Sequence, residues 1–271
     1  MTQAAFDVTS PGTLRQLVAL ARMELLALRR NLTATALVVV FPLGLGLLQL
    51  GGYDAGAVGP SAAVARMTST IGVIVILFVH HHLVTVYASR RQELVLKRLR
   101  AGLPADWTIL AGAASGTVAI FLGQALVLAG YGVLALGLPV PANPLTVGLA
   151  MLLVAALLAA VSAALSAVTR ASEAAMLTTL PTMALFLVTP GMLVPFGALP
   201  RGLEAAAWFL PLGPFPEVVR SGWLGQDPNG AELSLLAGLV EVLPGLVVLA
   251  GWLVLASLVA RYVFRWEPRH G

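Results

Sequence analysis

The chain has 271 residues, of which 59% are hydrophobic and only 10% are charged, and its mean hydropathy is +0.92. Soluble domains carry about a quarter charged residues, so this composition excludes an ordinary soluble domain and indicates a protein that resides in lipid. Cysteine is absent, which excludes disulfides, thiolate catalysis and cysteine-ligated metals. The net charge is +4, and because the basic residues lie between apolar runs, we interpret it as a sign of membrane topology and expect no nucleic-acid partner.

The first predicted element is an amphipathic helix from Ser10 to about Arg30, since Ser10 and Pro11 suit the N-cap and the first helical position. Apolar residues recur along one side and arginines along the other: Leu14, Leu17, Val18, Ala21, Leu25 and Leu28 against Arg15, Arg22 and Arg29. We assign residues 1–33 to the cytoplasm and expect the helix to lie in the membrane interface, on lipid. A helix packed on protein is the alternative.

Six apolar segments follow, and each is long enough, or nearly so, to cross a hydrocarbon core about 30 Å thick. They cover residues 34–50, 67–88, 108–136, 145–168, 174–194 and 235–262. Pro181 and Pro190 fall inside the fifth segment and Pro244 inside the sixth, and we expect these prolines to kink their helices. The prediction is an all-α membrane protein with one six-span domain over residues 34–262 and a cytoplasmic tail, 263–271.

The stretch between the fifth and sixth segments, residues 195–234, is broken by prolines. Its apolar pieces, such as residues 205–210, are too short to cross a bilayer. We interpret the stretch as one or two short re-entrant helices, because irregular backbone at membrane depth is tolerated only against protein or a water-filled cavity. A plain surface loop is the alternative.

The distribution of basic residues predicts the orientation. All lysines and arginines except Arg66, Arg201 and Arg220 fall in the N-terminal segment, the connection 89–107, the turn after the fourth span, or the end of the sixth segment and the tail after it. Because cytoplasmic loops carry an excess of lysine and arginine, we place both termini and the connection 89–107 in the cytoplasm. The stretch 195–234 is then external.

The connection after the second span is the segment most informative for function. From residue 90 to 104 its sequence is RRQELVLKRLRAGLP, in which leucines alternate with charges. It can form a short amphipathic helix that docks in a groove of a soluble partner. A positive loop lying on anionic lipid headgroups is the alternative.

This segment resembles the loop after the second helix in ABC-2-type transporter permeases, which has Arg and Glu, then Leu-(Lys/Arg)-Arg-Leu, then Leu-Pro. The matching residues are Glu93, Leu96, Lys97, Arg98, Leu99, Leu103 and Pro104. Gln92 stands where many members have a further Glu. The helix before the first span, the six spans and residues 211–220 extend the resemblance over most of the chain, and the daunorubicin-resistance-type permease of multidrug exporters is the most similar type.

The resemblance implies the membrane subunit of an ATP-driven ABC exporter that moves an amphipathic drug, lipid-like molecule or glycan outward. In the family this loop carries a coupling helix that contacts a separate ATPase, and the role transfers to Glu93, Arg98, Leu99 and Leu103. The chain has no G-x-x-x-x-G-K-[ST] loop, so we expect ATP and Mg to be bound by the partner ATPase and none by this chain. We expect a transport subunit and not an enzyme, paired with a second permease subunit, identical or different.

The expected location is a bacterial plasma membrane, with lipid as a further partner. Lys97 is the only lysine among the basic residues, and this bias toward arginine suggests a GC-rich bacterial genome.

Four ionisable residues inside predicted spans are candidates for the translocation pathway: His80, His81, His82 and Glu241. Successive helical residues point about 100° apart, so the three histidines cannot all line one cavity or chelate one metal. Interhelical hydrogen bonds with snorkelling, a substrate-lining or proton-sensitive site, and a metal or haem site are the alternatives. Glu241 is either hydrated or paired with an external arginine such as Arg220.

Two other transporter classes stay open. The histidines keep a haem-handling, cytochrome-maturation-type ABC permease as one alternative, and an ion-gradient-driven secondary transporter is the other. An intramembrane metalloprotease is disfavoured because H-E-x-x-H is absent, and we expect no metal site. Residues 112–116, Gly-Ala-Ala-Ser-Gly, are one residue off the turn of a rhomboid-like serine protease, and their spacing is typical of close helix packing.

Overall fold

The computed structural model describes residues 13–52, 59–101, 105–227 and 229–267, and within these ranges it is helical, with two isolated β-bridges and no strands. The elements are α1 (Thr13–Arg30), α2 (Leu32–Thr35), the π-helical η1 (Ala36–Val40), α3 (Phe41–Gly51), α5 (Pro60–Ile74), the π-helical η2 (Val75–His80), α6 (His81–Gln92), α7 (Val95–Arg100), α8 (Asp106–Leu134), α9 (Pro144–Ser166), the 3₁₀ turn η3 (Ser172–Ala174), α10 (Ala175–Leu187), α11 (Arg201–Trp208), α12 (Phe215–Leu224) and α13 (Leu235–Val263). The prediction of an all-α fold is confirmed.

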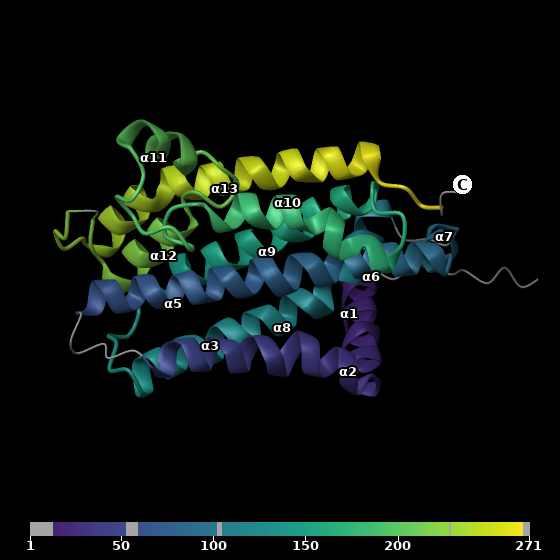
Figure 1. Cartoon of the computed structure of the whole chain (residues 1–271), viewed down its shortest axis with the longest axis horizontal. Helices are drawn as coiled ribbons and strands as arrows, with labels where there is room; N and C mark the ends of the chain where they lie inside the picture. Colours follow the sequence, from purple (N-terminus) through teal and green to yellow (C-terminus); the bar gives the residue numbers. More distant parts are fainter. Residues whose placement is uncertain (1–12, 53–58, 102–104, 228, 268–271) are drawn as a thin grey trace, which may run out of the picture.

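The long helices lie side by side and form a bundle (Figure 1). In the described part of the chain, four helices are long and apolar enough to cross a membrane: Pro60–Gln92, Asp106–Leu134, Pro144–Ser166 and Leu235–Val263. Two shorter apolar helices, Ala36–Gly51 and Ser172–Leu187, accompany them. These six helices match the six predicted segments in order, whereas six membrane crossings remain a prediction.

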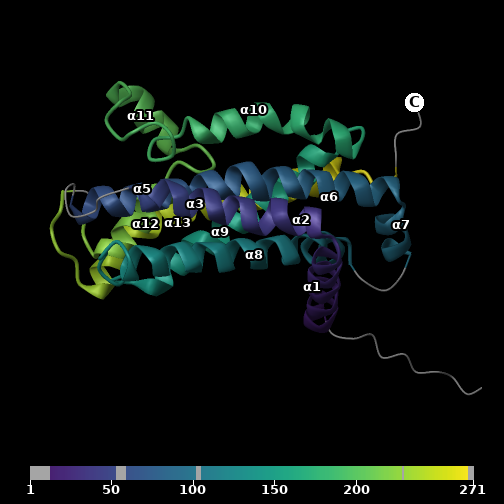
Figure 2. The same cartoon turned by 60° about the horizontal axis from the view of Figure 1, so that its bottom comes forward.

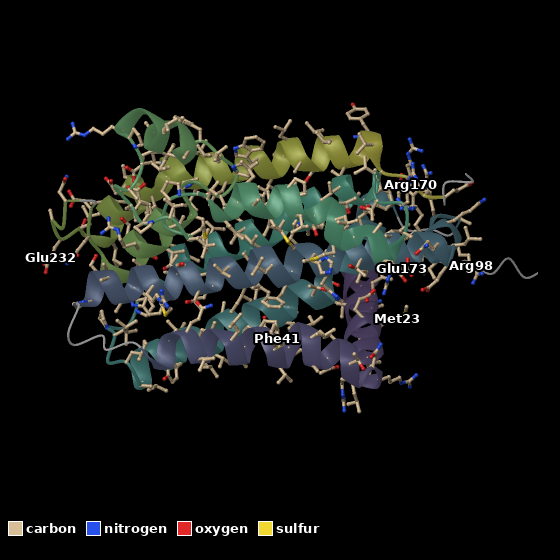
Figure 3. The ribbon with its side chains drawn as sticks, in the orientation of Figure 1. Met23, Phe41, Arg98, Arg170, Glu173 and Glu232 are labelled. Atoms are coloured by element: carbon tan, nitrogen blue, oxygen red, sulfur yellow. The ribbon has the colours of Figure 1, made fainter. Side chains whose placement is uncertain are left out.

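One end of the bundle gathers the basic segments, and we call it the basic end. Helix α1 crosses the long helices steeply there, and α7 and the end of α13 lie at the same end (Figures 1 and 2). Arg98, Arg170 and Glu173 lie at this end, and Glu232 lies at the opposite one (Figure 3). The structure thus groups the segments that the charge pattern placed together in the cytoplasm.

Helix α1 packs on α8 through the small residues of residues 112–116. A Cβ at Gly112 would lie 2.3 Å from Leu20 Cδ1, and one at Gly116 would lie 2.6 Å from Glu24 Cβ. The two glycines, one turn apart, therefore admit two side chains of α1 at close range. The prediction of close helix packing at this spacing is confirmed, and α1 does contact protein, as the alternative for this helix stated.

The fifth apolar segment is shorter than predicted. Helix α10 ends at Leu187, so Pro181 lies inside it while Pro190 lies in the following turn, and the prediction that Pro190 kinks a helix is wrong. Proline disfavours helical backbone in the residue before it. Gly191, at a φ of 84°, then reverses the chain, with its amide nitrogen 2.8 Å from the carbonyl oxygen of Val194.

The proline-broken stretch forms two short helices, as predicted, and they differ in burial. Helix α12 is packed against α5, α9 and α13 and buries Phe215, Val219 and Trp223, whose indole donates to the carbonyl oxygen of Pro139 at 2.8 Å. No residue of α11 is buried. Helix α12 is therefore part of the bundle core, and entry of the stretch into the membrane remains a prediction.

Candidate coupling surface at the basic end

Helix α7 is a short helix turned sharply off the end of α6. Leu94 adopts a left-handed conformation (φ 59°), which ends α6 and starts α7 within two residues. Leu96 is fully buried and Leu99 is half-buried against the core, whereas Glu93 and Arg98 are exposed. Of the four predicted coupling residues, Glu93 and Arg98 are thus exposed and Leu99 packs on the bundle. Leu103 lies outside the described residues.

Polar contacts join α7 to the start of α8 and to the residues that follow α13. The guanidinium of Arg100 donates to Asp106 at the start of α8 (3.0 Å) and lies 4.7 Å above the ring of Trp266. Lys97 forms an ion pair of 2.8 Å with Glu267. Each exposed ion pair contributes little stability alone, but together with buried Leu96 they keep α7 in one place.

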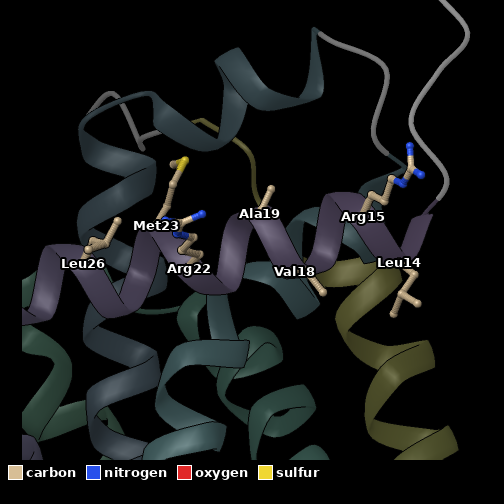
Figure 4. Close-up of a pocket in the computed structure, with 7 residues that line it drawn as sticks. All are labelled: Leu14, Arg15, Val18, Ala19, Arg22, Met23 and Leu26. Atoms are coloured by element: carbon tan, nitrogen blue, oxygen red, sulfur yellow. The ribbon is translucent and has the colours of Figure 1, made fainter.

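A groove lies along the outward side of α1, near α7. Its volume is about 510 Å³ and its walls are mainly apolar. It is lined by Leu14, Arg15, Val18, Ala19, Arg22, Met23 and Leu26. Ala19, Met23 and Leu26 project from the same side of the helix (Figure 4). Leu14 is 74% exposed and Met23 58% exposed, so the groove is an uncovered apolar surface.

The packed side of α1 carries a half-buried carboxylate, Glu24, which sequence reasoning missed. Glu24 forms an ion pair with Arg90 of α6. Burial raises the pKa of Glu24 above its ordinary value, and the nearby Arg90 opposes this shift. A single Glu in an otherwise apolar and basic helix was the available signal, because a buried charge needs a partner.

The histidines of the second apolar segment are distributed over three environments. His80 is fully buried, with Nδ1 2.7 Å from Ser162 Oγ of α9 and Nε2 2.9 Å from Thr182 Oγ1 of α10. His81 is half-buried and its Nδ1 lies 3.3 Å from Thr179 Oγ1. His82 is half-buried. Interhelical hydrogen bonding thus occupies both nitrogens of His80, and within the described residues no group of three or more His, Asp or Glu side chains could hold a metal ion.

Glu241 is not brought together with the histidines. It lies exposed in the second turn of α13, and α13 starts at the end of the bundle opposite the basic end (Figure 1). His80 directly precedes α6, which leads to the basic end. Arg220 donates to the carbonyl oxygen of Asp227 at 3.3 Å, and no ion pair with Glu241 occurs in the described part of the chain.

Gln124 is a second residue that sequence reasoning missed. It is buried on α8, and its side-chain amide donates to the carbonyl oxygens of Val38 (2.9 Å) and Val39 (3.0 Å) in η1. A π-helical segment widens the helix and leaves carbonyls without their usual partners, and Gln124 supplies donors for two of them. A lone amide in a long apolar segment was the signal for this contact.

Two larger cavities lie elsewhere in the bundle. One of about 960 Å³ lies toward the basic end between α1, α8, α9 and α13, with mainly apolar walls and Asp106, Arg261 and Trp266 among its lining. Another of about 770 Å³ lies at the opposite end between α5, α11 and α12, where Trp208 Nε1 donates to Glu217 at 2.9 Å. Both volumes suit a small organic molecule.

Comparison with known proteins identifies the family. A search of curated proteins returned no match. The sequence model of the family described as ABC-2 type transporter matches residues 15–224, which run from the first turn of α1 through α7 to the end of α12. The chain therefore belongs to the ABC-2 type transporter family of membrane domains and is a permease subunit of an ABC transporter, not itself catalytic.

Proposed function

We propose that this permease is the membrane subunit of an ATP-driven exporter of the daunorubicin-resistance type, which moves an amphipathic drug, lipid-like molecule or glycan outward across a bacterial plasma membrane. The observation that carries the proposal is α7, a helix with a buried anchor at Leu96 and exposed charges at Glu93 and Arg98. A helix anchored in this way can be displaced as a rigid unit by a soluble partner without unfolding.

The groove on α1 supports the same assignment. It offers a mainly apolar surface at the same end of the bundle as α7 (Figures 1 and 2), and Arg15 and Arg22 line it. A soluble ATPase subunit would bury the apolar walls and place acidic groups near the arginines, as interfaces with apolar centres and charged rims do. ATP and Mg would be held by that subunit.

The mechanism we propose is a rigid-body movement. Closure of two ATPase subunits would displace α7 in each of two permease subunits, and the bundle would open toward the other side. The cavity between α5, α11 and α12 is the candidate exit, because charged and apolar groups line it together. The apolar cavity near Arg261 is the candidate entry for an amphipathic molecule.

A pull-down tests the ATPase partner. The intact chain should recover an ABC ATPase, and Arg98→Asp should abolish recovery because it reverses an exposed charge on α7 without removing a buried group. Arg201→Asp is the matched control, since Arg201 is exposed on α11 outside the groove and α7. Equal recovery by both variants would contradict docking at α7.

Two transport measurements address the remaining alternatives. Replacement of His81 and His82 by Leu should leave transport and its pH profile unchanged if these histidines only pack, whereas an altered profile would assign them to the pathway. Transport driven by an ion gradient in vesicles that hold the purified chain alone would instead establish a secondary transporter.

A further inference from the structure

Three successive residues at the end of α6 bind three different segments of the basic end. Arg90 pairs with Glu24 of α1, and Arg91 donates to the carbonyl oxygens of Ser166 and Thr169 at the end of α9. The side-chain oxygen of Gln92 accepts from the backbone nitrogen of Ser172 in η3 at 3.3 Å. The residue pairs are far apart in sequence, so this junction is purely tertiary.

Arg91 is the central member of the junction. Its side chain is 2% exposed, and its guanidinium lies 2.7 Å from the carbonyl oxygen of Ser166. The last carbonyls of a helix lack intrahelical donors and carry the negative end of the helix dipole, so a cation there is stabilised by both effects. The planar fork of arginine can reach two carbonyls at once, which a lysine ammonium cannot do with fixed geometry.

The contacts continue from Arg91 toward the other end of the bundle. Thr169 Oγ1 lies 2.9 Å from Thr178 Oγ1 of α10, so the turn that Arg91 binds is tied to α10. Helix α10 leads through the turn at Pro190 to α11 and the exit cavity. On the other side, α7 starts three residues after Gln92.

We infer that Arg91 is a positioning residue that passes movement of α7 to the end of α9 and to α10. This inference rests on the proposed docking of an ATPase at α7. Arg91 is then the side chain through which a displacement of α7 reaches α9 and α10. Without Arg91, α7 would move on the hinge at Leu94 with a smaller displacement of α9 and α10, because only the bonds from His80, His81 and Gln92 would still join them to η2 and α6.

Spin-label distances in the assembled transporter test this inference, because the chain has no cysteine and accepts labels only at engineered positions. Ala101, after α7, and Met176, on α10, are exposed reporter sites, and Leu126, 74% exposed on α8, is a common reference. Each pair is converted to Cys, labelled, combined with the ATPase subunit and measured with and without ATP under non-hydrolysing conditions.

In the parent chain, ATP should shift both the 101–126 and the 176–126 distances. In Arg91→Gln the 101–126 shift should remain and the 176–126 shift should be clearly smaller than in the parent chain, because His80 and His81 still bond to α10. Arg91→Lys should give an intermediate 176–126 shift. Arg170→Gln, which removes an exposed arginine from the same turn, should behave as the parent.

The possible failures are distinguishable. Both shifts intact in Arg91→Gln would overturn the role of Arg91, and the parent showing no 101–126 shift would overturn docking at α7 itself. If Arg91→Gln does not fold, Arg91→Lys decides the matter: a full 176–126 shift in a chain that lacks the fork would refute the inference.

Discussion

The ion pair between Glu24 and Arg90 determines how firmly α1 is attached to the bundle. Two charges in contact near a protein surface attract by about 4 kcal/mol. Burial offsets much of this attraction, as the raised pKa of Glu24 indicates, although Arg90 opposes that shift. Both side chains are mostly covered, at 13% and 20% exposure, so removal of one partner leaves a poorly solvated charge. We expect a coupling energy of about 1–2 kcal/mol between them.

A double-mutant cycle measures this coupling. Glu24→Gln, Arg90→Gln and the double variant are compared by hydrogen exchange of the amides of α1 in lipid nanodiscs, since local opening of the helix exposes them. Each single variant should lower protection by about 10-fold, which corresponds to about 1.4 kcal/mol, and the double variant by much less than the product of the two. Additive effects, within about 0.3 kcal/mol, would refute the reasoning.

The same variants have a distinct pH dependence. In Arg90→Gln only burial acts on Glu24, so the pKa of its carboxyl should rise further above the unfolded value. A carboxyl whose pKa is higher in the attached helix than in the unfolded chain stabilises the attached helix at pH values below the unfolded pKa. This stabilisation is lost as the pH rises through the higher, native pKa. Protection of α1, corrected for intrinsic exchange, should therefore increase from about pH 8 to about pH 5 in Arg90→Gln. Glu24→Gln should not show this increase, and an equal increase there would contradict the assignment.

Three further predictions concern contacts between helices. Gln124→Leu removes two hydrogen bonds to η1 and should cost about 1–2 kcal/mol, seen as a lower Tm of the purified chain; an unchanged Tm would contradict it. Gly112→Val should displace α1 and cost about 1–3 kcal/mol by overpacking, whereas Gly123→Val on the same helix, with open space around its Cβ, should be nearly neutral in the same exchange experiment. His80→Leu removes the bond to Thr182 and should speed exchange in α10 by several-fold, about 0.6 kcal/mol for a typical membrane hydrogen bond; unchanged exchange would show that packing alone holds α10.

The positions of the helices were largely predictable from the chain because long apolar runs leave few alternatives. The segments predicted at 108–136 and 145–168 are Asp106–Leu134 and Pro144–Ser166 in the structure. The second helix begins at Pro60, before the apolar segment 67–88, because small and polar residues at its start are compatible with helix but not strongly apolar. Helix α10 ends earlier than predicted because the chain turns at Pro190 and Gly191. Hydropathy averaged over a window does not predict such a local turn.

The candidate coupling segment was predicted only in part. Its amphipathic pattern located α7, but the pattern does not say which leucine is the anchor, and burial assigns that role to Leu96. Likewise, the sequence identified the histidines as unusual without specifying their partners. Ser162 and Thr182 become partners of His80 only when α9 and α10 pack on η2.

Composition and periodicity by themselves determine that this chain is a helical membrane protein, since an apolar helix in lipid satisfies its own backbone hydrogen bonds whatever its neighbours are. The grouping of basic residues also follows from sequence, because it depends only on the order of segments. The roles of individual charges were decided by tertiary structure. The rule that predicts membrane topology counts Arg90, Arg91 and Arg98 alike. Packing distinguishes them: Arg90 pairs with Glu24, Arg91 is buried at the end of α9, and Arg98 stays exposed. The energy of a charge depends on what surrounds it, and residues distant in sequence supply those surroundings.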